Sequence, residues 1–386
     1  MLRSNQFVLL ASVGCLLPTA HARAAEVGYY AQPPLNGNTL VFVSEGDLWS
    51  ATIPSDANAP ITAFRLTSSE GAESRPCISP DGKQLAFSAQ YDGNVDVYVM
   101  PIDGGAPKRL TFHPASDTAL AWTPDSQHVL FSSPRVQPLN RPELWRISPV
   151  LGGMPERFAF GECTMINFSS TGKRFAFTRW SNENWTWKRY RGGTAPEIWL
   201  GDLGNDSFTP LTHDRANDLF PMWLMDRVFF LSDRTGTSNI FSENPNSPGK
   251  DTKQHTQFAS DSKNPTAIDG YDARWPSADS GRGGRSIVFC QAGGLALLDV
   301  TSNAVRRLNV QLASDRVAAR QRFAKLNETI TEYDIAPDGK HVLIGTRGEV
   351  LRIPVEGGAV QQMTQASPAR EWGASHLGAD QIVMIT

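Results

Sequence analysis

Short runs of alternating apolar and polar residues fill most of the chain, and turn-forming residues separate them. The turn Ser79–Gly82 precedes the run Gln84–Ser88, and the related turn Thr123–Ser126 precedes His128–Ser132. A turn signal next to a short β-favouring run predicts a β-hairpin. The pair recurs at Ser169–Gly172 with Arg174–Thr178 and at Ala336–Gly339 with His341–Gly345. This repeat of about 40 to 50 residues indicates one structural unit used many times.

A second type of strand follows each hairpin, with an acidic or polar residue, a branched apolar residue and usually an aromatic one. Its examples are Asp47–Trp49, Asp96–Tyr98, Glu143–Trp145, Glu197–Trp199 and Asn239–Phe241. A closing strand is marked by Arg65–Thr67, Arg109–Thr111, Pro210–Thr212 and Arg307–Leu308. Each unit therefore has four strands. Four-stranded units in series predict the blades of an all-β propeller, because each blade covers its faces with its neighbours.

Counting the units predicts a six-bladed β-propeller within residues 25–309. The blades are expected at 28–67, 74–111, 117–158, 163–212, 219–258 and 271–308. The first blade has a candidate inner strand of its own near Tyr29–Gln32, and the sixth has its own outer strand. Closure of the ring is therefore predicted to rest on packing alone, with no strand exchanged between the ends.

Residues 310–386 predict a linker and the first one and a half blades of a second, incomplete propeller. The stretch Ala313–Leu326 suits a short helix or an ordered linker. A seventh unit follows at Ile330–Thr364, and half of an eighth at Arg370–Ala379 and Gln381–Thr386. The last of these segments is uncharged and favours β-structure, so we expect it to leave an unpaired strand edge that can pair with another chain.

The amino-terminal segment, residues 1–24, has the features of a secretory signal peptide. Arg3 precedes the apolar run Phe7–Leu17, and small residues that suit cleavage after Ala22 or Ala24 follow. The apolar run is too short to span a membrane. Ser12 replaces the branched apolar residue that a lipoprotein signal requires before Cys15, so export to the periplasm as a soluble protein is expected.

Charge and cysteine content narrow the function further. A net charge of −3 and a pI of about 6.2 provide no basic field for nucleic acid or an anionic membrane. The mature chain keeps Cys77, Cys163 and Cys290, an odd number that we expect to act as small buried hydrophobic residues. The histidines are not spaced as metal ligands, so neither a metal site nor a cofactor is predicted.

No catalytic residue is predicted either. The chain has no G-x-S-x-G elbow, and Gly373–His376 is only an approximate match in the incomplete unit. Ser260 and Lys263 have a catalytic Ser-x-x-Lys spacing but lie in a polar run. Asp81, Asp125 and Asp338 are expected to cap the backbone of their own turns.

The strongest candidate site is the segment Asn182–Thr194, inserted between the second and third strands of the fourth blade. It combines three aromatic side chains with three cations, and the candidate peptide-binding residues are Lys188, Arg189, Tyr190 and Arg191. Arginine can hold a carboxylate with two hydrogen bonds, and aromatic rings can stack on a peptide. The alternative is that the aromatic residues fill a gap between blades while the cations stay solvated.

Several segments together resemble one protein family. They are Tyr29–Ala31 through Asp47–Trp49, Trp187–Thr194 with Glu197–Trp199, Phe230–Arg234 and Tyr271–Pro276. They look like the amino-terminal propeller of tricorn protease and its bacterial homologues, over Gly28–Thr386. Single blade motifs are shared with TolB-like propellers, whereas the Tyr-Arg-Gly-Gly stretch is more specific.

The resemblance implies the propeller part of a serine oligopeptidase of peptidase family S41. In that family a second propeller, a PDZ module and a peptidase domain follow, and all catalytic residues lie beyond the part that corresponds to this chain. The implied role is to gate or bind oligopeptides for a peptidase domain, in a family that forms homo-oligomers. Two alternatives remain at this point: a free-standing TolB-like scaffold that binds envelope proteins, and an enzyme that uses the propeller funnel.

Overall fold

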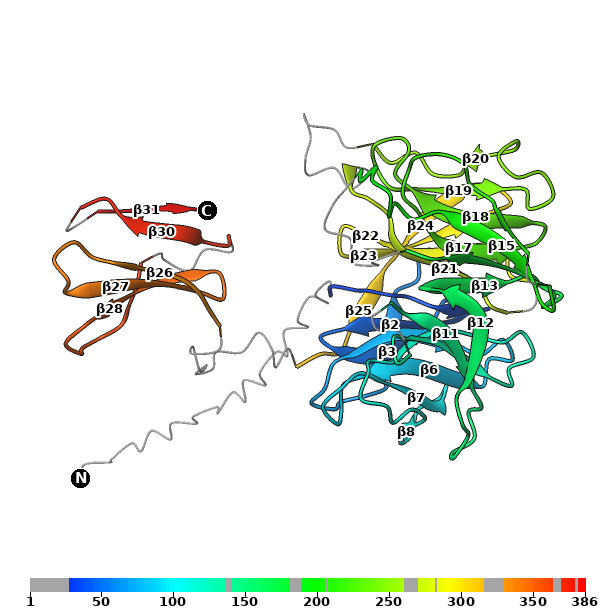
Figure 1. Ribbon diagram of the computed structural model, residues 1–386, viewed down its shortest axis with the longest axis horizontal. Helices are drawn as coiled ribbons and strands as arrows, with labels where there is room; N and C mark the ends of the chain where they lie inside the picture. The colour runs from blue at the N-terminus through cyan, green and yellow to red at the C-terminus, as the bar shows by residue number, and fades with distance from the viewer. Residues whose placement is uncertain are drawn as a thin grey trace, which may run out of the picture. The chain divides into compact units, whose positions relative to one another are not determined.

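The computed structural model describes residues 28–136, 141–180, 189–205, 207–259, 270–281, 283–315, 329–363, 369–378 and 381–386. Every regular element within these ranges is a β-strand. The chain divides into two units, Met1–Asp315 and Arg316–Thr386, and each is described by itself (Figure 1). The predicted signal peptide lies outside the described residues, as does most of the stretch Ala313–Leu326.

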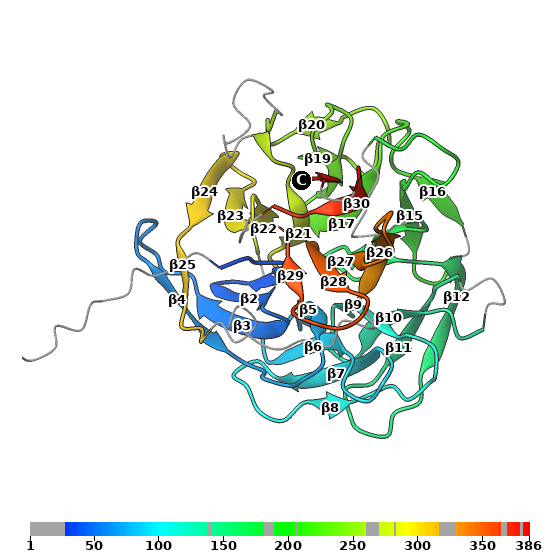
Figure 2. The ribbon, with the colours of Figure 1, turned by 90° about the vertical axis from the view of Figure 1, so that its left-hand side faces the viewer.

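The first unit is a ring of six antiparallel sheets around one axis (Figure 2). Blades 1 to 3 contain β1 (Leu35–Asn36), β2 (Thr39–Ser44), β3 (Asp47–Thr52), β4 (Ile61–Arg65); β5 (Glu73–Ile78), β6 (Gln84–Ala89), β7 (Asp96–Pro101), β8 (Lys108–Arg109); β9 (Thr118–Trp122), β10 (Val129–Ser133), β11 (Glu143–Ile147), β12 (Glu156–Glu162). Blades 4 to 6 contain β13 (Met165–Phe168), β14 (Arg174–Thr178), β15 (Ile198–Asp202), β16 (Phe208–Pro210); β17 (Asp218–Leu224), β18 (Arg227–Ser232), β19 (Asn239–Glu243), β20 (Lys253–Gln254); β21 (Arg274–Ala278), β22 (Ser286–Gln291), β23 (Gly294–Asp299), β24 (Ala304–Leu308). The predicted six-bladed, four-stranded propeller is confirmed.

The core lies between the blades. The second strand of each blade is buried on both faces, as in β6, where Leu85, Ala86, Phe87 and Ser88 are fully buried. One core cluster joins Ala86 and Val97 of blade 2 to residues of blade 3, including Phe131. Each blade therefore depends on its neighbour for burial, which is why the motif has to repeat.

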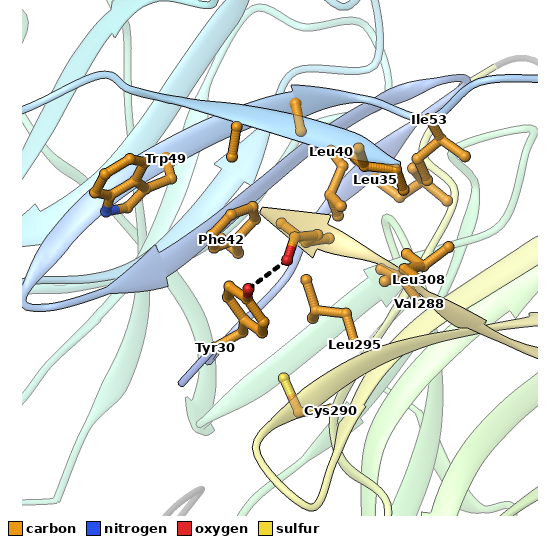
Figure 3. Packing of buried hydrophobic residues seen from close by; sticks show 14 of the residues in the cluster. Tyr30, Leu35, Leu40, Phe42, Trp49, Ile53, Val288, Cys290, Leu295 and Leu308 are labelled. Carbon is orange, nitrogen blue, oxygen red and sulfur yellow. Dashed lines mark hydrogen bonds between the residues drawn. The ribbon is translucent and has the colours of Figure 1, made fainter. Parts of the chain in front are cut away.

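The predicted closure of the ring by packing alone is wrong. A strand after blade 6, β25 (Val310–Leu312), crosses to blade 1 and pairs in parallel with β4, giving a five-stranded sheet. The hydroxyl of Tyr30 donates a hydrogen bond of 2.8 Å to the carbonyl oxygen of Val310 (Figure 3). Both ends of the ring are thus fixed to each other, and this strand belongs to the first unit rather than to a linker that begins at residue 310.

The inner strand of blade 1 also differs from the prediction. It lies at β1, whereas only Ala31 of the predicted stretch Tyr29–Gln32 pairs within the blade, in a bridge with Val43. The backbone N–H of Tyr30 instead donates to the carbonyl oxygen of Gly293 in blade 6. This second contact between the terminal blades adds to the closure.

The Arg-Leu-Thr tripeptides have a structural role at the blade junctions. The hydroxyl of Thr67 accepts a 2.9 Å hydrogen bond from the backbone N–H of Leu48 and donates to the Glu73 carboxylate of blade 2 at 2.8 Å. Thr111 accepts in the same way from the N–H of Val97. The threonine thus ties the outer strand of a blade to its third strand, and at Thr67 also to the following blade.

The second unit contains one four-stranded sheet and a separate pair of strands. The sheet is formed by β26 (Ile330–Ile335), β27 (His341–Thr346), β28 (Glu349–Pro354) and β29 (Gln361–Gln362), and the pair by β30 (Trp372–His376) and β31 (Ile382–Ile385). These elements match the predicted seventh unit and half of an eighth. Within the described residues, β31 pairs only with β30. No helix that is long and apolar enough to cross a membrane occurs in the described part of the chain.

Candidate functional site

The inner strands of blades 2 to 6, and the segment before β1 in blade 1, surround a central cavity of about 140 Å³, here called the waist. Its lining comprises Gln32–Pro34, Arg75–Pro76, Ala119–Leu120, Met165–Asn167, Phe220–Met222 and Trp275–Ala278. Arg75 is the only charged residue in this lining. The rest of the lining is uncharged and rich in proline, with Gln32, Asn167 and Ser277 as its polar side chains, which suits an extended chain more than a highly charged ligand.

Four of these inner segments share one local structure. Gln32, Arg75, Phe220 and Trp275 have φ between 45° and 55°, and each directly precedes a proline. The register of β5, β17 and β21 shifts at these positions, as expected for a β-bulge. Proline has no N–H to leave unpaired on the inner edge of a blade, and the bulge re-aims the preceding side chain.

Two larger cavities adjoin the waist. The turn-side mouth, about 580 Å³, is lined by the later halves of the inner strands and by turns such as Pro80, Pro124 and 279–281. It shares Pro34, Pro76 and Asn167 with the waist. The loop-side pocket, about 300 Å³, is lined by Arg75, Ala115, Ser116, Thr118, Ser132, Pro134, Pro142 and Thr164. Arg75 lines both the loop-side pocket and the waist, so these two cavities are neighbours within the ring.

The predicted insertion lies between β14 and β15 of blade 4, as expected, but Lys188 falls outside the described residues. Arg189 and Arg191 lie against blade 5. The backbone N–H of Arg189 donates to the carboxylate of Asp233 at 3.0 Å, and Arg191 pairs with the same carboxylate at 3.1 Å. Arg189 also donates from Nε to the carbonyl oxygen of Gly236.

At Arg189 and Arg191 these contacts differ from the alternative in which the cations stay solvated. Asp233 is buried and accepts further hydrogen bonds from the backbone and side chain of Asn217. Tyr190 accepts a hydrogen bond from Thr194 within the insertion. The segment therefore joins blades 4 and 5, and peptide binding by Arg189, Tyr190 and Arg191 stays a prediction.

Replacing Arg191 by Ala should lower the free energy of unfolding by about 1 kcal/mol, because its partner Asp233 is buried while the arginine is half-exposed. The substitution Arg189→Ala should cost less, since its backbone hydrogen bond to Asp233 remains. Urea unfolding of both variants measures this. Equal and negligible losses would show that the ion pair contributes nothing to stability.

A serine, a histidine and an asparagine in blades 5 and 6 form an arrangement that sequence reasoning missed. Oγ of Ser242 lies 2.8 Å from Nε2 of His255, and Nδ1 of His255 lies 2.7 Å from Oδ1 of Asn303. Ser242 is fully buried, and Nε of Arg227 donates to its hydroxyl at 2.8 Å. Burial lowers the pKa of His255, which favours the neutral ring that this hydrogen-bond chain requires. Because no substrate reaches a buried hydroxyl, the cluster is a structural link between two blades.

The turn aspartates behave as predicted. Asp81, Asp125 and Asp338 each accept a hydrogen bond from a backbone N–H two residues later. The hydrogen bond from Ser79 lowers the pKa of Asp81, and the one from the backbone of Lys340 lowers that of Asp338. Their role is local turn geometry.

The remaining candidates add no chemistry. Cys163 and Cys290 are buried and Cys77 is half-buried, all three unpaired, and burial raises the pKa of Cys77 to about 12. Ser260 and Lys263 lie outside the described residues. In the described ranges no three His, Cys, Asp or Glu side chains gather as metal ligands.

The fold defines a six-bladed propeller with cavities at its centre, and comparison with known proteins assigns its family. The model of the tricorn protease N-terminal beta propeller domain matches residues 27–304. The chain belongs to the tricorn protease family and represents its amino-terminal propeller region.

Relatives support this assignment. Tricorn protease homolog 1 of Streptomyces coelicolor is 32% identical over 306 residues, which cover 76% of this chain. A putative tricorn-like protease N-terminal subunit of Sulfurisphaera tokodaii is 29% identical over 184 residues, 46% of this chain and 89% of that relative. The crystal structure of the tricorn protease has a TM-score of 0.65 at 19% identity and covers 93% of this chain and 33% of that one, which supports the fold. The chain spans only 26% to 29% of the length of several full-length relatives.

Proposed function

We propose that this chain binds and gates oligopeptides for a peptidase domain carried by another segment or a partner chain. The observation that supports it is the series of neighbouring cavities at the centre of the ring: the loop-side pocket, the waist and the turn-side mouth. The waist has a volume of only about 140 Å³, which suits part of a short peptide better than a folded protein. The name of the Sulfurisphaera tokodaii relative, an N-terminal subunit, fits a propeller that works with a separate catalytic part.

The test is to block the waist. Ser277 lies on the inner strand β21 and lines the waist and the turn-side mouth, so Ser277→Trp should fill part of both cavities. We expect it to weaken binding of a labelled mixture of short peptides, measured by fluorescence anisotropy, by about tenfold or more. Val305→Trp, on the outer strand β24 of the same blade, introduces the same side chain at an exposed site and should change nothing.

Two results would count against the proposal. If the unmodified chain binds no peptide, the propeller has another role. If both tryptophan variants bind peptides as well as the unmodified chain, peptides do not use these cavities.

Export forms part of the same proposal. It is supported by the charged, apolar and small-residue segments within residues 1–24. The mature protein should begin after Ala22 or Ala24 in the periplasm, which amino-terminal sequencing of the protein isolated from its host checks. An intact Met1 on the functional protein would contradict it.

A further inference from the structure

One position near the end of each inner strand lines the turn-side mouth and differs in size from blade to blade. In every blade this residue pairs with an apolar residue near the start of the second strand. From blade 1 to blade 6 the position holds Leu35, Ile78, Trp122, Phe168, Trp223 and Ala278. Three consecutive blades, 3 to 5, therefore present an aromatic side chain at the mouth, whereas blade 6 presents only a methyl group.

The blade 6 side of the mouth has few side chains. The turn that follows Ala278 contributes Gly281, Gly283 and Gly284 to the lining. In a ring of six blades, blade 6 lies across the axis from blade 3, which carries Trp122 (Figure 2). The cavity of about 580 Å³ is thus bounded by an aromatic wall on one side and by small residues on the other. This shape leaves room for a ligand next to the rings.

Two of the three wall residues are fixed by contacts between blades. Nε1 of Trp122 donates a 2.9 Å hydrogen bond to the carbonyl oxygen of Cys77 on blade 2. The backbone N–H of Trp223 donates to Oδ1 of Asn167 on blade 4 at 2.7 Å, and the guanidinium group of Arg174 lies 5.4 Å from the centre of its ring. Rings that are positioned before a ligand arrives reduce the entropic cost of binding.

The charged groups of the mouth do not favour a charged ligand. Among its described lining residues only Asp279 and Arg285 carry a charge. The carboxylate of Asp279 accepts hydrogen bonds from the backbone N–H groups of Gly37 at 2.7 Å and Gly281 at 2.9 Å. Arg285 is exposed, so an ion pair there stays in water and contributes little. An aromatic ligand gains most, because pairing between rings adds to the burial of apolar surface.

We propose that the turn-side mouth binds an aromatic side chain of an oligopeptide, against the wall formed by Trp122, Phe168 and Trp223. This inference rests on the proposed peptide-binding function and deepens it by naming the side chain that is recognised. The mouth shares Pro34 and Pro76 with the waist, so a peptide held at the waist can place a nearby side chain in the mouth. Peptides with an aromatic residue are then bound in preference to small or charged ones.

The experiment compares four unlabelled pentapeptides by isothermal titration calorimetry. Each is acetylated and amidated at its ends, has alanine at four positions and carries phenylalanine, leucine, alanine or glutamate in the middle, so that only one side chain differs. We expect the phenylalanine peptide to bind about tenfold or more tightly than the alanine peptide, as for burial of one large apolar side chain. The leucine peptide should lie between them, and the glutamate peptide should bind no better than the alanine peptide.

Two variants test the wall. Trp223→Leu keeps an apolar side chain but removes one ring, so it should reduce the preference for phenylalanine over alanine to about threefold or less. Met225 lines the rim of the mouth and is exposed, and aspartate tolerates its φ of 54°. Met225→Asp should therefore fold normally and reduce the preference to a similar extent, because it places a carboxylate beside the bound ring.

Each variant has a matched control in blade 4. Trp199→Leu makes the same change at a half-buried tryptophan on β15, and Leu203→Asp introduces the same charge at an exposed apolar residue after that strand. Neither residue lines the waist, the loop-side pocket or the turn-side mouth. Both controls should keep the full preference for phenylalanine. Thermal unfolding of all four variants verifies the fold.

The outcomes separate this inference from the proposed function. Equal binding of the phenylalanine and alanine peptides by the unmodified chain overturns the aromatic site but leaves peptide binding intact. A full preference that persists in folded Trp223→Leu places recognition elsewhere and also overturns it; if that variant does not fold, the same result in Met225→Asp decides. Tightest binding of the glutamate peptide would assign the mouth to Arg285 instead. Failure to bind any of the four peptides rejects both proposals.

Discussion

A chain that ends at Asn309 should lose most of its stability, whereas a chain that ends at Asp315 should unfold as one cooperative ring. The difference is the strand β25, which pairs with β4 through Val310–Ile61, Gln311–Thr62 and Leu312–Ala63. Both truncated chains keep all six four-stranded blades and lack the second unit. Only the shorter one leaves the outer edge of blade 1 without its partner.

Two contributions make the expected loss large. Val310 is 4% exposed within the core cluster shared by blades 1 and 6, and burying such a side chain contributes about 1.5 to 3 kcal/mol. The parallel strand pairing and the hydrogen bond from Tyr30 to the Val310 carbonyl add about 1 kcal/mol for each bond. The sum, about 5 kcal/mol, approaches the whole stability of many domains.

Guanidinium-induced unfolding followed by tryptophan fluorescence measures the difference between the two truncated chains. The variant Tyr30→Phe in the longer chain should lose about 1 kcal/mol, because it removes only the hydroxyl. Equal midpoints for the chains that end at Asn309 and Asp315 would show that packing alone closes the ring, as the sequence suggested.

The blades were predictable because each carries its own local signals, while the closing strand was not. The turn at Ser79–Gly82 and the tripeptide Arg109–Thr111 mark strands that pair with their neighbours in sequence. The run Ala304–Leu312 alternates without a turn signal, yet its first part pairs with β23 and its last part with blade 1. A pattern of period two indicates a strand but not which partner it takes, particularly when the partner lies at the other end of the chain.

The candidate insertion was located correctly from its composition, but its contacts depend on the geometry between blades. No sequence pattern links Arg191 to Asp233, because they belong to different repeats. The waist residues had a usable signal: an inner strand interrupted by proline at Gln32-Pro33, Arg75-Pro76, Phe220-Pro221 and Trp275-Pro276. Alignment of the repeats on these prolines would have placed Arg75 at the axis.

The second large loss of stability is expected on breaking a buried ion pair in blade 5. Asp218, at the start of β17, is fully buried, and Nη2 of Arg234 lies 3.1 Å and 3.2 Å from its two carboxylate oxygens. Arg234 also donates to the hydroxyl of Ser232 and lies over the rings of Phe230 and Phe241. Removing one partner leaves the other charge buried and uncompensated, which costs about 3 to 5 kcal/mol.

The variant Arg234→Met should therefore lower the free energy of unfolding at pH 7 by about 3 kcal/mol or more, because it leaves the buried Asp218 carboxylate without its cation. Replacing both residues, as in Asp218→Asn with Arg234→Met, should cost less than the sum of the single changes, because neither charge is then buried alone. The exposed pair Arg146–Glu156 is the matched control, and Glu156→Ala should change stability by less than about 0.5 kcal/mol.

The same carboxylate should give the ring a measurable pH dependence. Burial raises the pKa of Asp218 to about 6 despite the attraction of Arg234, whereas an aspartate in the unfolded chain has a pKa of about 3.9. Between these values the folded state binds the proton more strongly than the unfolded state, so this group makes the free energy of unfolding fall as pH rises from about 4 to 6. Above pH 6 its contribution is constant.

Urea unfolding from pH 4 to pH 7.5 should show this slope in the unmodified chain and a weaker one in Asp218→Asn. An identical slope in both proteins would mean that Asp218 stays ionised throughout, with Arg234 outweighing the effect of burial.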